Sequence, residues 1–339
     1  MTKGTKIFRI TISTLLALSI VFLIMLTTEY IDIYKKVSED EGYKIFVAGV
    51  EVTNDNEDDV LGDGCVCYDS VNNILTFENA DIAYDYSIVY SLDDLMIQLV
   101  GENKFTLEGS YIPAVYAANY CLTKDLAFIG DGSLTIEYKG ECSDAMGIYA
   151  RNLSVDSSDI TVIMPDSSTN ISNGVCAEGS IFLRNGASVT VDNGPAKYSS
   201  GVKAYGNLNL ETGTSLNVIA RPGTTETCKG VSVVGSLVMW DGTALSVTID
   251  DEAAAASECL NVLGSISLGK NATINASAKK VCSIEAFGAI ELNEGATVTA
   301  NTEGEGVDFL CYGAIADFGA TVNGELEALS GEFDKTKAE

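Results

Sequence analysis

Gly201-Val-Lys-Ala-Tyr-Gly206 is one copy of a six-residue phrase that occurs eight times between Ala114 and Gly313. The other copies are Ala114-Val-Tyr-Ala-Ala-Asn119, Gly147-Ile-Tyr-Ala-Arg-Asn152, Gly174-Val-Cys-Ala-Glu-Gly179, Gly230-Val-Ser-Val-Val-Gly235, Cys259-Leu-Asn-Val-Leu-Gly264, Ser283-Ile-Glu-Ala-Phe-Gly288 and Asp308-Phe-Leu-Cys-Tyr-Gly313. Successive copies begin 24–33 residues apart, a spacing typical of repeat proteins. Apolar residues alternate with mixed ones, which is the period of a β-strand. Because so short a unit cannot bury its apolar side alone, the copies must stack, and the phrase predicts a β-solenoid.

Two further short strands follow each phrase, as in Leu208–Leu210 and Ser215–Val218, with the turn formers Glu211-Thr-Gly213 between them. Glycine and asparagine at such corners supply the left-handed backbone that a tight turn needs. Three strands and three corners per coil describe an all-β fold, a parallel β-helix of about eight to nine coils.

Within the phrase, the second and fourth residues are expected to face the core, because no charge occurs in either column. These core pairs are Val115/Ala117, Ile148/Ala150, Val175/Ala177, Val202/Ala204, Val231/Val233, Leu260/Val262, Ile284/Ala286 and Phe309/Cys311.

The fifth residue of the phrase is expected to face outward, and its last five members form an apolar and aromatic stripe. The column runs Ala118, Arg151, Glu178, Tyr205, Val234, Leu263, Phe287 and Tyr312. Outward aromatic rings can stack against sugar rings, so Tyr205, Phe287 and Tyr312 are candidate glycan-binding residues, expected to be exposed and roughly coplanar. The alternative is that a long loop or the C-terminal segment from Gly324 onward covers the stripe.

Near the N-terminus, Ile10 to Thr28 is a stretch of 19 residues without a charge, preceded by Lys3, Lys6 and Arg9. As a helix it would be about 28 Å long, enough to cross the bilayer core. The basic flank is expected to stay in the cytoplasm, which places the rest of the chain outside the cell. A cleaved signal peptide is the alternative, but no Ala-x-Ala cleavage site follows the stretch.

The sequence is therefore divided into five parts. Residues 1–28 are a cytoplasmic basic tip and transmembrane anchor, 29–45 a stalk, 46–86 an N-terminal β cap, 87–323 the parallel β-helix and 324–339 a C-terminal tail. The cap is expected because the open edge of the first coil must be covered.

Composition restricts the chemistry of the exported part. A formal net charge of −28 repels nucleic acid, and the lack of histidine excludes Ser-His-Asp and Cys-His catalysis. Acidic loops such as Asp250–Glu252 could gather Ca²⁺, although no cofactor is required. Arg151 or Arg184 beside clustered carboxylates would indicate a calcium-dependent polysaccharide lyase.

Nine cysteines are an odd number for an exported chain, and the sequence leaves their pairing open. Cys65 and Cys67 share one side of an expected strand and are not expected to bridge each other.

Four segments near the start of the coils resemble a family of carbohydrate-binding-domain-containing bacterial surface proteins. They are Val47-Ala-Gly-Val-Glu-Val-Thr53, Asp59-Val-Leu-Gly-Asp-Gly64, Tyr68 to Ile82 and Leu99-Val-Gly-Glu-Asn103. Those proteins are common in Gram-positive gut anaerobes and follow this opening with Gly-Ile-x-Ala-x-Gly coils. The resemblance covers roughly residues 46–320 and implies a right-handed parallel β-helix similar to pectate lyases. No binding residue of the family can be carried over by position.

Together these observations predict a single-pass membrane protein whose extracellular β-helix binds a polysaccharide or cell-surface glycan without cleaving it. The membrane is contacted through the N-terminal helix only. A structural or adhesive solenoid that binds proteins is the main alternative, and a lyase is the third.

Overall fold

The computed structural model describes residues 42–108, 113–119, 122–251, 254, 256–280, 284–303, 309–324 and 326–328. Contacts group residues 44–52 and 56–339 into one unit, which contains the whole solenoid. The expected transmembrane span at residues 10–28 lies outside the described residues, as does most of the expected stalk. None of the described residues forms a helix long and apolar enough to cross a membrane.

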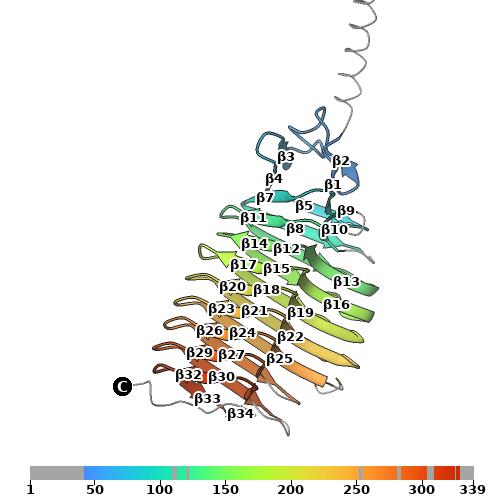
Figure 1. The fold of residues 1–339 in the computed structure, drawn as a ribbon. Coiled ribbons are helices and arrows are strands. Elements are labelled where there is room, and N and C mark those ends of the chain that lie inside the picture. Colours follow the sequence, from blue (N-terminus) through green and yellow to red (C-terminus); the bar gives the residue numbers. More distant parts are fainter. Residues whose placement is uncertain are drawn as a thin grey trace, which may run out of the picture. The chain divides into compact units, whose positions relative to one another are not determined.

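The solenoid consists of three sheets (Figure 1). Sheet A runs β2 (Val50–Glu51), β1 (Ile45–Val47), β6 (Val89–Ser91), β9 (Val115–Asn119), β13 (Glu141–Ala150), β16 (Ser167–Ala177), β19 (Tyr198–Ala204), β22 (Thr227–Val233), β25 (Ala256–Val262), β28 (Ile284–Ala286), β31 (Phe309–Cys311) and β34 (Leu326–Ala328), with β10 (Leu122–Thr123) beside β9. Sheet B runs β3 (Val66–Asp69), β4 (Ile74–Glu78), β7 (Leu95–Val100), β11 (Leu126–Ile129), β14 (Leu153–Asp156), β17 (Ile181–Arg184), β20 (Leu208–Leu210), β23 (Leu237–Met239), β26 (Ile266–Leu268), β29 (Ile290–Leu292) and β32 (Ile315–Asp317). Sheet C runs β5 (Asp81–Tyr84), β8 (Glu102–Leu107), β12 (Ser133–Tyr138), β15 (Asp159–Ile163), β18 (Ser188–Asn193), β21 (Ser215–Ala220), β24 (Ala244–Ile249), β27 (Thr273–Ala278), β30 (Thr297–Thr302) and β33 (Thr321–Asn323).

Each turn adds one strand to sheet B, one to sheet C and one to sheet A, and it pairs in parallel with the turns on either side. The predicted all-β parallel solenoid is confirmed, with about eight turns. Sheet C has ten strands, because one further set of three strands, one in each sheet, lies at each end of these turns.

Antiparallel pairing marks the N-terminal end of the unit. Strand β1 pairs antiparallel with β2 and with β6, and β3 pairs antiparallel with β4. Strands β4 and β5 lie inside the segment expected as a cap, yet they pair in parallel with β7 and β8. Parallel stacking therefore already begins at Ile74.

The core columns were predicted correctly. All sixteen side chains in the second and fourth positions of the phrase are at most 2% exposed. They face the alternate residues of sheets B and C, such as Leu210 and Val218, which are also fully buried.

The first glycine of the phrase is required by close packing across the core. An added Cβ on Gly147, Gly174, Gly201 or Gly230 would lie 2.1–2.4 Å from a Cγ1 atom of a valine in sheet C. Those valines are Val162, Val191, Val218 and Val247, in the order of the glycines. Non-bonded carbon atoms do not approach so closely. In these four coils the valine therefore fits only because the facing position of sheet A is a glycine, which has no side chain.

Side chains at the corner between sheets A and B bond one turn to the next. Asn152 Oδ1 accepts a hydrogen bond from the Ser180 amide at 2.9 Å, and Ser180 Oγ accepts one from the Asn207 amide at 3.0 Å. Asn207 Oδ1 then accepts one from the Ser236 amide at 2.9 Å. These contacts satisfy amides that the corner removes from the strand ladders.

Candidate ligand-binding face

The predicted stripe lies directly after the strands of sheet A, at the corner with sheet B. Tyr205 is 49% exposed, Phe287 is 43% exposed and Tyr312 is half-buried. The amides of Tyr205 and Phe287 donate to carbonyls of the preceding turn, at 3.0 and 2.9 Å, so successive side chains follow one another along the stack.

The rings of the stripe do not form one flat surface. Phe287 and Tyr312 lie 4.6 Å apart at an angle of 9°, so they stack face to face instead of lying side by side. Tyr205 is separated from them by Val234 and Leu263, and Lys203 Nζ lies 4.7 Å from its ring centroid. The stripe therefore presents two separate aromatic points with an aliphatic surface between them.

A larger aromatic group lies on the outer side of sheet A, near the N-terminal end of the solenoid. Phe46, Tyr90, Tyr116 and Tyr149 occupy matching positions on β1, β6, β9 and β13. Neighbouring ring centroids are 5.9, 5.6 and 5.5 Å apart, with interplanar angles of 24–30°. These four rings form a continuous aromatic ladder.

An aromatic cleft opens beside this ladder. Its volume is about 340 Å³, and it is lined by Phe46, Gly49, Tyr84, Tyr86, Ser87, Tyr90 and Tyr116. Tyr86 is 61% exposed, and its ring lies 5.9 Å from that of Tyr84 at an angle of 61°. Solvent therefore reaches an aromatic surface on one side of the cleft, while the ladder forms the other side.

A carboxylate lies at the far end of the ladder. Both the Tyr149 hydroxyl and the Thr123 hydroxyl donate hydrogen bonds to Glu178. Burial, and then the nearby Glu178 carboxylate, raise the pKa of Tyr149. The phenol thus stays protonated and remains a hydrogen-bond donor at neutral pH.

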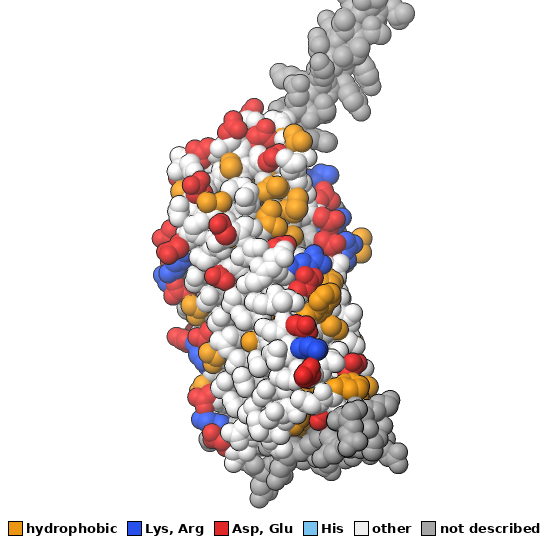
Figure 2. Space-filling view, turned by 90° about the vertical axis from the view of Figure 1, so that its left-hand side faces the viewer, with side chains coloured by type: hydrophobic (Ala, Val, Ile, Leu, Met, Phe, Trp, Pro, Cys, Tyr) orange, Lys and Arg blue, Asp and Glu red, His pale blue; other side chains and the backbone are white. Residues whose placement is uncertain are grey.

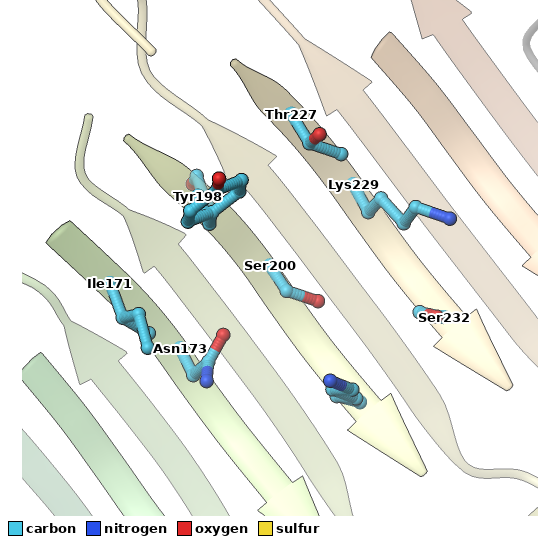
Figure 3. A pocket seen from close by; sticks show the side chains of 9 residues that line it. Ile171, Asn173, Tyr198, Ser200, Thr227, Lys229 and Ser232 are labelled. Carbon is cyan, nitrogen blue, oxygen red and sulfur yellow. The ribbon is translucent and has the colours of Figure 1, made fainter. Parts of the chain in front are cut away.

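Farther along sheet A, a polar groove of about 370 Å³ crosses β16, β19 and β22 (Figure 3). It is lined by Ile171, Asn173, Tyr198, Ser199, Ser200, Lys203, Thr227, Lys229 and Ser232. Lys229 pairs with Glu258 at 2.8 Å, and Tyr198 is 45% exposed.

Two of the acidic loops that precede the phrase, at Asp166 and Asp192, are bridged by one arginine. Arg221 pairs with Asp166, and its Nε lies 2.9 Å from Asp192 Oδ1. Within the described ranges, no group of three or more Cys, Asp or Glu side chains is arranged to hold a metal ion. Figure 2 shows acidic side chains spread along the described coils, several of them beside a lysine or arginine.

The two arginines considered as lyase bases are each engaged with carboxylates. Arg151 donates two hydrogen bonds to Asp125, at 2.7 and 2.8 Å, and Arg184 Nε lies 3.1 Å from Glu211 Oε1. The hydrogen bond with Asp125 raises the pKa of Arg151, so the guanidinium keeps its proton and is even less available as a general base.

Cys65, Cys67, Cys142, Cys176, Cys228 and Cys311 carry free thiols, whereas the Cys259 thiol donates a hydrogen bond to the Ser277 carbonyl at 2.8 Å. Cys121 and Cys282 lie outside the described residues. Cys67 is exposed, whereas Cys176, Cys228, Cys259 and Cys311 are buried, so those four act as small apolar side chains.

The aromatic ladder was not predicted from the sequence, because its tyrosines stand in the third column of the phrase and the predicted stripe is the fifth. Tyr116 and Tyr149 are both third residues, and Tyr90 holds the same place in an incomplete copy. Phe46 had no sequence signal, since its strand joins the sheet in the antiparallel sense.

Comparisons with protein-family models, with curated proteins and with solved structures found no match for this chain.

Proposed function

We propose that this protein binds a glycan on the cell surface without cleaving it, and that the aromatic cleft is its main contact. The observation that supports this most is the convergence of five aromatic side chains on one open cleft of about 340 Å³. Sugar rings present apolar C–H faces together with hydroxyls, and clefts lined by aromatic residues with a few polar groups suit such ligands. Tyr86 offers an exposed ring, while tyrosine hydroxyls in the lining offer hydrogen bonds.

A binding role without catalysis is supported by the state of the charged groups. Arg151 and Arg184 are both paired with carboxylates, and the pKa of Arg151 is raised, so this guanidinium keeps its proton. The proposed binding does not require calcium, and treatment with a chelator tests whether calcium contributes to it.

The proposed location outside the cell rests on the uncharged stretch at residues 10–28 with its basic flank. The proposed anchor is this stretch, with a cleaved signal as its alternative.

A protein-binding, adhesive role is the second candidate, and the corner stripe favours it. Val234 and Leu263, 42% and 47% exposed, lie between the aromatic residues of the stripe. Aliphatic side chains do not stack with sugars in the way that rings do, but they do suit a protein partner.

The test is retention of the full chain, kept in solution with a non-ionic detergent, on insoluble plant, mucin and bacterial-wall polysaccharides. Tyr86→Ala is expected to weaken retention about tenfold or more. Burial of a large side chain by a ligand contributes more binding free energy than the about 1.4 kcal/mol that corresponds to a tenfold change in affinity. Trp240→Ala is the matched control, since Trp240 is 55% exposed and lines neither the aromatic cleft nor the polar groove.

Three outcomes separate the candidates. Loss with Tyr86→Ala but not with Trp240→Ala supports the aromatic cleft, and loss only in the Tyr205/Phe287/Tyr312 triple Ala variant moves binding to the stripe. Sensitivity to a chelator would add calcium to the site. No retention on any polymer would refute glycan binding and favour the adhesive role.

A further inference from the structure

The polar groove carries an ordered set of hydrogen-bonding side chains. Asn173, Ser200 and Lys229 are register partners on β16, β19 and β22. Figure 3 shows Ser200 in the middle of the groove, with Asn173 on one neighbouring strand and Lys229 on the other. Lys203 and Ser232 are partners in the row nearest the sheet B corner.

Ser200 is the unusual member of this set. Its side chain is only 8% exposed, lines the groove, and its hydroxyl has no hydrogen-bond partner among the described residues. A buried hydroxyl without a partner is destabilising, and native proteins contain few of them. A ligand atom in the groove would supply the missing partner.

Lys203 is unusual because its ammonium group has no carboxylate partner in the described structure. Within the described part of the chain, no carboxylate lies within 4 Å of its ammonium group, whereas Lys229 beside it pairs with Glu258. This is unexpected in a chain with 48 acidic and 20 basic side chains. At physiological ionic strength the distant acidic groups are screened over about 8 Å, so contacts inside the groove decide which charge it accepts.

We propose that the polar groove binds a uronic-acid unit of an acidic polysaccharide. The carboxylate lies on Lys203, sugar oxygens bond to Ser200 and Asn173, and the sugar ring packs against Tyr198. Of the two lysines that line the groove, only Lys203 is without a carboxylate partner in the described coils, which matches one singly charged group, and the neutral donors around it match sugar hydroxyls. This inference rests on the proposed glycan-binding function, because it names the class of polymer that the same sheet would bind.

The test compares two polymers that differ only in the acid group, unmodified cellulose and cellulose oxidised at C6. The full chain is expected to be retained more strongly on the oxidised form, and added salt is expected to reduce the difference. Lys203→Gln is expected to lower retention on oxidised cellulose about tenfold and thereby to remove most of the difference between the two polymers. Lys139→Gln removes the same charge from an exposed lysine outside the groove and serves as the control.

Ser200→Ala distinguishes a ligand contact from a structural role. Removal of a partnerless buried hydroxyl is expected to leave the thermal midpoint unchanged or to raise it, while retention on oxidised cellulose falls. A lowered midpoint together with unchanged retention would assign Ser200 to the fold and refute its role here.

Other results overturn the inference in distinct ways. Equal retention on both celluloses would refute the acidic class while leaving glycan binding intact. Preference for cellulose sulfate over oxidised cellulose would replace the carboxylate by a sulfate. Retention on neither cellulose refutes the uronate site, and the proposed function fails with it only if the whole polysaccharide panel is also negative.

Discussion

Replacement of Gly201 by alanine tests the packing rule that produces the repeated phrase. The new Cβ would lie 2.2 Å from Val218 Cγ1 and 2.8 Å from the carbonyl oxygen of Gly230. Overpacking of this kind costs about 1–3 kcal/mol, and the lower backbone entropy of alanine in the unfolded chain returns about 0.4–1 kcal/mol. We expect the free energy of unfolding to fall by about 1–2 kcal/mol.

Val218→Ala supplies the second arm of a double-mutant cycle. Alone it removes two buried methyl groups and costs about 2 kcal/mol. In the double variant the clash with Cγ1 is absent and only the Gly230 carbonyl contact remains. The two changes together are therefore expected to cost about 1 kcal/mol less than their sum.

Gly213→Ala is the control for this cycle. Gly213 has a φ of +78° and nothing within 4 Å of an added Cβ, so its cost arises from backbone conformation alone. Its effect is expected to add to that of Val218→Ala within about 0.5 kcal/mol. Urea unfolding can be followed by the fluorescence of Trp240, the only tryptophan, whose amide bonds to Leu210 of the preceding turn at 2.8 Å. Strict additivity of Gly201→Ala with Val218→Ala would refute the packing rule.

Two further predictions concern ionisable groups. Iodoacetamide at neutral pH is expected to modify the exposed Cys67 long before Cys228, because burial raises the pKa of the Cys228 thiol to about 12; peptide mass spectrometry gives the order, and equal rates would contradict the buried placement. The hydrogen bond from Arg151 lowers the pKa of Asp125, so this pair stabilises the fold above the unfolded pKa of about 3.9 and loses that effect as pH falls through the lower folded value. The difference in thermal midpoint between the natural chain and Arg151→Gln should thus be present at about pH 6 and vanish once the pH falls below the folded pKa of Asp125, and a difference that persisted in stronger acid would point to lost packing instead.

The inward side of the solenoid could be predicted because burial imposes one rule on every turn. Val202 and Ala204 must be apolar since a one-residue slip would expose the whole column, and the same constraint acts in each copy. The phrase therefore predicted the strands of sheet A, and the two short strands after it predicted those of sheets B and C.

Contacts between loops could not be predicted in this way. Arg221 reaches Asp166, which is 55 residues earlier, because loops two turns apart lie close together. The sequence contains no periodic signal for such a pair, since each loop differs in length and composition. The acidic side chains of two such loops, Asp166 and Asp192, both contact Arg221.

The outer side of sheet A shows how such a fold could acquire a binding function. The third column of the phrase continues from the tyrosines at 116 and 149 to Cys176, Lys203, Ser232, Asn261 and Glu285. Cys176 and Asn261 are buried, but the other members are partly exposed, so packing of the core does not fix their residue type, which changes from aromatic to basic and then acidic along the stack. Turns are separated by about 4.8 Å, so the four turns from Tyr90 to Lys203 span about 19 Å. A polymer lying along the stack would therefore meet the aromatic cleft before the polar groove. A single sugar could occupy either site, but only an extended chain could contact both, which makes ligand length the property that would join the two proposed sites.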